Sequence, residues 1–222
     1  MASKSRVKKK RIKEDQLVTF TVKASQFIQQ YFTHVVIGLV VLVVAVGAIL
    51  ISGHLRRSAA SESEQQFALA MSQYNVGDMQ TATTSFKQIA DKYGGQTNGQ
   101  LSRFFLGKAL LAQGKYDEAQ QAFERYLSKS GKDAPFRSAA VIGKATCMQE
   151  LRNFAPAAEA LEELSRTLDE KDPRLFEVLY QAATNFEKAG SRDKAAELYR
   201  RVAQEAAGSL KDRASVALAQ LE

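Results

Sequence analysis

The stretch LSRFFLGKALLAQGKYDEAQQAFERYL, residues 101–127, contains a pattern that recurs along the chain. In this stretch Gly114 is followed five residues later by Ala119, and four residues after that by Phe123. Equivalent segments begin at Gly77, Arg152 and Gly190, so the spacing between segments is 37 or 38 residues. A small residue lies seven positions before the start of each segment: Ala70, Gly107, Ala145 and Ala183. A period of this length is typical of stacked helical repeats.

The residue types in each segment predict a pair of closely packed helices. A small side chain in the first helix and an Ala early in the second let the two helices approach, and the large apolar residue fills the space before the next unit. The pattern resembles the tetratricopeptide repeat, which has a period of about 34 residues. Residues 56–222 contain no strand-type alternation. We therefore predict an all-α solenoid of about four helical hairpins with a C-terminal capping helix.

Short motifs predict where individual helices begin. Ser61-x-x-Glu64 has the form of a capping box that opens the first helix of unit one. Asp172-Pro173 places a cap before a proline at a first helical position, and residues 209–221 form the predicted last helix with Ser209 as its cap. Residues 93–99 form a predicted flexible link, and Arg152 in place of Gly predicts a less tight turn in unit three.

A second feature is the apolar segment VVIGLVVLVVAVGAILI, residues 35–51. Its lack of a polar stripe argues against a soluble core helix, and the 34 residues before it argue against a cleaved signal peptide. At 1.5 Å per residue, an uncharged helix over residues 34–55 is long enough to cross roughly 30 Å of hydrocarbon. We predict a single transmembrane helix there.

The charge distribution predicts the orientation of this helix. The first 23 residues contain eight Lys or Arg and two acidic residues, whereas the chain from Arg56 onward contains 23 basic and 22 acidic residues. Because positive segments remain in the cytoplasm, we predict a cytoplasmic tail at residues 1–15 and a periplasmic domain at residues 56–222. Arg56 and Arg57 on the far flank argue for the opposite orientation. Anionic membrane lipid is the predicted partner of the tail, and no nucleic acid is expected.

Residues 16–33 connect the tail to the apolar segment. Leu17, Phe20, Phe27 and Tyr31 recur at helical spacing among polar residues. This pattern predicts an amphipathic helix at the membrane interface. A simple extension of the spanning helix is the alternative.

The sequence contains little that supports catalysis. Its two histidines, His34 and His54, flank the apolar segment, so residues 56–222 lack the histidines for a metal site or an activated nucleophile. Cys147 is the only cysteine, and its position in a first helix predicts a buried small residue. We predict a non-enzyme with no cofactor and no metal.

The resemblance to tetratricopeptide repeats implies a groove lined by the first helix of each unit. The residues that it assigns to partner binding are Phe67, Met71, Tyr74, Phe104, Lys108, Leu111, Ile142, Gln149, Tyr180 and Glu187. Such a groove is apolar in its first half and acidic at its end, and an exposed patch of this kind marks interaction sites. The alternative is that the aromatic side chains pack between units.

The order of tail, anchor and repeats, with EDQLVTFTVKASQFIQQYFTHVVIGLVV before and within the anchor, resembles the YfgM-type ancillary subunits of the bacterial Sec translocon. The resemblance implies an inner-membrane scaffold whose periplasmic repeats bind translocon subunits, a membrane-bound chaperone or prolyl isomerase, or emerging chains. Two alternatives keep the architecture: a scaffold for cell-envelope or division assembly, and a membrane-anchored receptor with its repeats in the cytosol.

Overall fold

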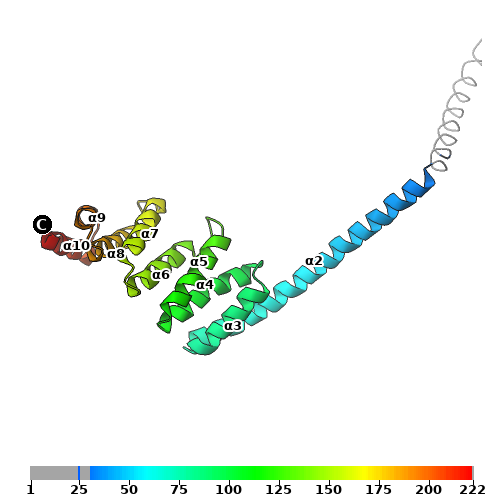
Figure 1. The fold of residues 1–222 in the computed structure, drawn as a ribbon, viewed down its shortest axis with the longest axis horizontal. Helices are drawn as coiled ribbons and strands as arrows, with labels where there is room; N and C mark the ends of the chain where they lie inside the picture. The colour runs from blue at the N-terminus through cyan, green and yellow to red at the C-terminus, as the bar shows by residue number, and fades with distance from the viewer. Residues whose placement is uncertain (1–24, 26–30, 222) are drawn as a thin grey trace, which may run out of the picture. The chain divides into compact units, whose positions relative to one another are not determined.

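The computed structural model describes residue 25 and residues 31–221, and within these ranges it contains helices, turns and no strand. The helices are α2 (Phe32–Asn75), α3 (Met79–Lys92), α4 (Thr97–Ala112), α5 (Tyr116–Lys129), α6 (Arg137–Glu150), α7 (Phe154–Thr167), α8 (Leu175–Lys188), α9 (Arg192–Glu205) and α10 (Ser209–Leu221). From α3 to α10, each helix packs against the next one along the chain (Figure 1). The predicted all-α repeat architecture is confirmed.

The chain divides into two compact units, Met1–Ser58 and Ala59–Glu222, and α2 runs through the boundary. In the first unit the apolar side chains of α2, such as Leu42 and Ile49, are exposed. This helix is long and apolar enough to cross a membrane. The predicted interfacial helix at residues 16–33 lies outside the described residues, except for Ser25 and residues 31–33.

In the second unit the repeats form four helical pairs and a final helix. The pairs are α2 from Ala59 onward with α3, α4 with α5, α6 with α7, and α8 with α9, while α10 follows alone. The small residues predicted to allow close approach are buried, and so are the large residues predicted to fill the space between units: Phe86, Phe123, Leu161 and Tyr199. The period in the sequence therefore corresponds to the packing unit of the core.

Phe123 shows how closely the helices approach. Its ring lies between two glycines, Gly107 on α4 and Gly143 on α6. A Cβ atom added at either glycine would meet a carbon of the ring, at 2.8 Å from Gly107 and 2.6 Å from Gly143. Because real Cβ atoms do not come so close to ring carbons, the positions of α4 and α6 around α5 depend on the absence of a side chain at both sites.

The turn inside each pair has the same form in all four units. Gly77, Gly114 and Gly190 have φ values of 84°, 71° and 81°, and Arg152 at the equivalent place has a φ of 60°. The Arg152 N–H donates to the carbonyl of Gln149 at 3.0 Å, and the Gly114 N–H donates to that of Leu111 at 3.0 Å. The less tight turn predicted for unit three is therefore wrong, because the arginine adopts the left-handed conformation that closes the helix.

Helix starts differ from three of the predictions. The link predicted at residues 93–99 is shorter, because α4 begins at Thr97. Ser61 and Glu64 do not open a helix, because α2 is continuous from Phe32 to Asn75 and both residues lie inside it. Helix α8 begins at Leu175, two residues after the predicted start. The Asp172 carboxylate accepts hydrogen bonds from the Arg174 N–H and guanidinium, and this contact lowers the pKa of Asp172 to about 2. Helix α10 spans the predicted residues, Ser209–Leu221.

Candidate protein-binding surface

The residues predicted to bind partners lie on the first helix of each unit. They are Phe67, Met71 and Tyr74 on α2, Phe104, Lys108 and Leu111 on α4, Ile142 and Gln149 on α6, and Tyr180 and Glu187 on α8. Contacts between α4 and α6 and between α8 and α10 place first helices next to one another. Lys108 is exposed and all the others except Phe104 are half-buried, so nine of these side chains are accessible on the repeat domain.

Phe104 does not belong to this accessible surface. Its side chain is only 3% exposed, and its ring stacks on Phe136 with a centroid distance of 4.7 Å and an angle of 8° between the planes. It also contacts the rings of Phe123 and Tyr126. The prediction for this residue is wrong, because a phenylalanine with aromatic neighbours on three sides fills the core between units two and three.

At the start of the surface, side chains from units one and two form an aromatic cluster. The rings of Phe67 and Tyr74 lie 5.8 Å and 6.0 Å from that of Phe105, and the Lys108 ammonium lies 5.6 Å from the centre of the Tyr74 ring. Sequence reasoning missed Phe105, which lies next to a predicted position and joins the two units. A cation above a ring that is still half-exposed leaves a surface that can contact both apolar and acidic groups.

Beside the apolar core shared by units three and four, Gln149 makes a polar contact between them. The Asn185 amide donates to the Gln149 side-chain oxygen at 3.2 Å and to the Gln181 carbonyl at 2.8 Å. Asn185 is 1% exposed, so the half-buried Gln149 satisfies a buried group while its remaining surface stays accessible. The sequence contains no signal for Asn185, since a single asparagine within a helix has no spacing that marks it as buried.

Glu187 has a similar double role. The Tyr199 hydroxyl donates to the Glu187 carboxylate at 2.9 Å and lies 3.0 Å from the Thr184 hydroxyl. Burial of the tyrosine, together with this carboxylate, raises the pKa of Tyr199 well above its usual range, so the hydroxyl stays protonated and remains a donor. Glu187 therefore joins α8 to α9, and because it is half-buried its side chain is also partly accessible to a partner.

The end of the surface includes the last helix. The Arg213 guanidinium of α10 lies 4.4 Å from the centre of the Tyr180 ring. These two residues line a pocket of about 380 Å³ together with Asp212, Val216, Ala217 and Gln220. Sequence reasoning treated α10 only as a cap and missed Arg213, because the repeat period carries the groove positions of α8 onto Ser215 and Leu218 and not onto Arg213.

The chemistry available on this surface is that of recognition. Aromatic rings, aliphatic side chains and a few polar groups on consecutive helices can contact the side chains of a peptide segment.

Cys147 is fully buried, and burial raises the pKa of its thiol to about 11, so the thiol stays protonated near neutral pH. Among the described residues no group of three or more His, Cys, Asp or Glu side chains is arranged to hold a metal ion.

Comparisons with solved structures agree with this architecture. The TPR-like repeats of a putative kinesin light chain from Podosopora anserina are 20% identical, with 73% of this chain and 86% of that chain covered and a TM-score of 0.58. MamA from Desulfovibrio magneticus RS-1 is 16% identical, with 65% and 75% covered and a TM-score of 0.54. YrrB, described as a TPR protein with an unusual peptide-binding site, is 16% identical, with 64% and 67% covered and a TM-score of 0.51. At these identities the likeness establishes the fold.

Family models identify the repeats directly. A comparison with curated proteins finds no match. The model described as "Tetratricopeptide repeat" matches residues 177–209, and the one described as "Tetratricopeptide repeat-like domain" matches residues 25–180. Because the second match covers more than half of the sequence and the helical pairs have the expected order, the chain belongs to the tetratricopeptide repeat-like domain family.

Proposed function

We propose that this protein is a membrane-tethered scaffold of the bacterial inner membrane, whose repeats bind other proteins beside the Sec translocon. Residues 1–15 form a cytoplasmic tail near anionic lipid, residues 16–33 an interfacial helix, residues 34–55 the membrane span and residues 56–222 a periplasmic domain. The partners are translocon subunits, a membrane-bound chaperone or prolyl isomerase, and emerging chains.

The observation that supports protein binding is the row of accessible side chains on consecutive first helices. Tetratricopeptide repeats generally bind proteins or peptides, and here the half-buried Met71, Ile142 and Tyr180 lie on three different first helices. Half-buried aliphatic and aromatic side chains are suited to hold a partner, since binding removes their remaining apolar area from water. The order of tail, anchor and repeats supports the assignment to the translocon.

Tethering supports the same role. Leu42, Ile49 and their apolar neighbours in α2 are exposed, and a membrane is the environment in which an uncharged helix of this length is stable. Membrane attachment raises the local concentration of a scaffold next to membrane partners, so that a weak contact is sufficient for association.

Photo-crosslinking from the full-length protein tests the proposal. A photoreactive amino acid is placed at Met71 or Ile142, with a matched control at Glu197, which is exposed on the second helix α9. We expect translocon subunits or a membrane-bound folding factor to crosslink from Met71 and Ile142 and not from Glu197. Capture of cell-wall enzymes alone would favour the envelope-assembly alternative, and capture of the same proteins from all three positions would contradict the assignment of the surface.

A further inference from the structure

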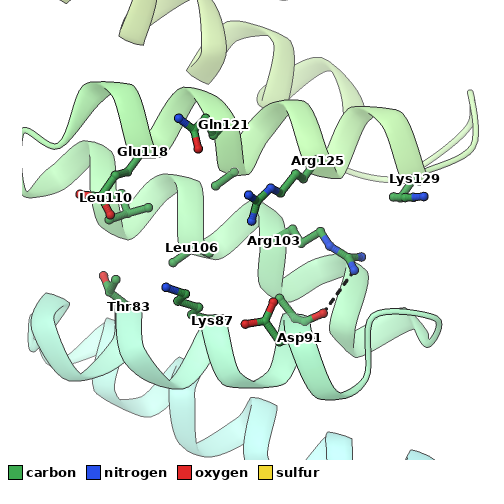
Figure 2. A pocket seen from close by; sticks show the side chains of 12 residues that line it. Thr83, Lys87, Asp91, Arg103, Leu106, Leu110, Glu118, Gln121, Arg125 and Lys129 are labelled. Carbon is green, nitrogen blue, oxygen red and sulfur yellow. Dashed lines mark hydrogen bonds between the residues drawn. The ribbon is translucent and has the colours of Figure 1, made fainter.

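A cleft lies between the second helices of units one and two, α3 and α5. Side chains of α3 and α5 face each other across a cleft of about 460 Å³, with α4 beneath them (Figure 2). Its floor is apolar and consists of Ala90, Leu106, Leu110 and Ala122. We call it the α3–α5 cleft, and none of the ten predicted partner-binding residues lines it.

The charged side chains around the α3–α5 cleft are mostly basic. Lys87, Arg103, Arg125 and Lys129 line it together with only two carboxylates, Asp91 and Glu118. Figure 2 shows Lys87 on α3 and Arg125 on α5 directed into the space between the two helices.

Three of the four cations are available to a ligand. Arg103 donates to the carbonyls of Gly94 and Ala90 at 3.0 Å and 3.2 Å, so its guanidinium is held by the end of α3. Lys87, Arg125 and Lys129 are exposed, and within residues 31–221 none of them forms an ion pair.

The next repeat shows that the fold does not require this positive charge. At the positions equivalent to Lys87 and Arg125, unit two has Glu124 and unit three has Glu163. These carboxylates pair within the domain, Glu124 with Lys144 at 3.1 Å and Glu163 with Arg166 at 3.1 Å. Lys87 and Arg125 therefore stand, without ion-pair partners among the described residues, at positions where the following units have the paired carboxylates Glu124 and Glu163.

We propose that the α3–α5 cleft binds an acidic peptide segment of a partner protein, whose carboxylates contact Lys87, Arg125 and Lys129. The half-buried Leu106 favours a peptide over a small anion, because its side chain offers nothing to an isolated ion and can cover an aliphatic side chain. Asp91 and Glu118 also line the cleft and disfavour a ligand of uniformly high negative charge such as nucleic acid. This site is on different helices from the predicted groove and does not depend on the translocon assignment.

Binding to defined peptides tests the site on the full chain in mild detergent. The probe is an array of short synthetic peptides in which each position is Glu, Lys, Gln or Leu. We expect the strongest binding to peptides that combine Glu with Leu, and we expect the double variant Lys87→Glu/Arg125→Glu to weaken it by on the order of tenfold or more. Lys87→Gln/Arg125→Gln should show a smaller loss, and raised salt should weaken binding to the unmodified protein.

Matched controls separate this site from the predicted groove. Lys171→Glu/Lys211→Glu makes the same change in net charge at exposed lysines outside the cleft and should leave binding unchanged. Unchanged circular dichroism of Lys87→Glu/Arg125→Glu shows that the repeats remain folded. The proposal is overturned by a preference for Lys or for Leu alone, by an array with no preferred peptide, or by binding that is lost in Tyr180→Ala and retained in Lys87→Glu/Arg125→Glu. None of these outcomes depends on what crosslinks from Met71.

Discussion

At the residue scale, Arg152 shows that backbone geometry can override residue preference. It takes the left-handed φ of 60° that glycine provides in the other three turns. The turn closes all the same, because the Asn153 N–H donates to the Met148 carbonyl at 2.8 Å, as the Lys115 N–H does to the Leu110 carbonyl at 3.0 Å. The arginine in unit three therefore adopts an unfavourable backbone conformation, but the turn loses no hydrogen bond.

Replacing this residue should stabilise the protein. A left-handed conformation costs a non-glycine residue about 1–2 kcal/mol, and glycine loses about 0.5–1 kcal/mol more backbone entropy on folding. We therefore expect Arg152→Gly to stabilise the repeats by up to about 1 kcal/mol, seen as a rise of about 2–4 °C in thermal midpoint by circular dichroism. The arginine side chain is exposed and makes no ion pair among residues 31–221, so its removal should cost little.

The reverse substitution serves as the control. Gly114→Ala places a side chain at a φ of 71° in the same kind of turn and should lower the midpoint. Gly131→Ala, where no atom lies within 4 Å of the added Cβ and φ is not positive, should not lower it. A lower midpoint for Arg152→Gly would show that the arginine side chain contributes more than its conformation costs.

At the scale of helices, the contact of α4, α5 and α6 depends on a single aromatic ring between two glycines. At the equivalent positions of unit three, Leu161 replaces the phenylalanine and Ala145 replaces the glycine of α4. Units one and four combine an alanine with an aromatic ring, Ala70 with Phe86 and Ala183 with Tyr199. The two glycines are therefore specific to the site where the Phe123 ring lies between α4 and α6, and where the close-packed interior leaves no room for an added methyl group.

Over-packing this contact should destabilise the domain. We expect Gly107→Ala and Gly143→Ala each to cost about 1–3 kcal/mol, because the new Cβ would lie within 3 Å of the Phe123 ring. In the Gly107→Ala background, Phe123→Leu should cost less than it does alone, since it makes room for the methyl group. Chemical unfolding of Gly107→Ala, of Phe123→Leu and of the double variant that combines them measures this coupling in the free energy of unfolding. Additive effects would mean that the helices move apart to accommodate the methyl group.

At the scale of the whole molecule, the proposed function depends on the orientation of the chain in the membrane, because the orientation sets which partners the repeats would reach. The basic tail favours a cytoplasmic N-terminus, whereas Arg56 and Arg57 argue for the reverse. The proposed function requires the first orientation, since a domain in the cytosol would meet different proteins.

Labelling of single cysteines tests the orientation. In a Cys147→Ala background, Lys115→Cys places an accessible thiol on the repeat domain, and Ser5→Cys places one in the tail. We expect a membrane-impermeant maleimide to label Lys115→Cys in intact spheroplasts and to label Ser5→Cys only after the membrane is opened. The opposite pattern would identify a cytosol-facing receptor.

Much of the repeat fold can be predicted from local pattern. The spacing of Gly114, Ala119 and Phe123 and its recurrence identify the helical pairs, because each of these residue types has a steric role within its own unit. The apolar character of residues 34–55 is likewise a property of consecutive residues. Helix starts are less predictable. The motif at Ser61 has the form of a capping box, but α2 continues through this position to Asn75.

The binding surfaces depend on contacts between units. Repeat position alone placed Phe104 in the groove, whereas stacking on Phe136 from the next unit buries it, and the contacts of Phe105 and Arg213 likewise join different repeats. The sequence by itself determined the repeat unit, its period and the apolar segment at residues 34–55, because helix periodicity, close approach and a run of apolar residues all act over short distances along the chain. Only the tertiary structure decided which side chains remain accessible and that Lys87 and Arg125 face one cleft, because exposure and charge pairing depend on neighbours from other units.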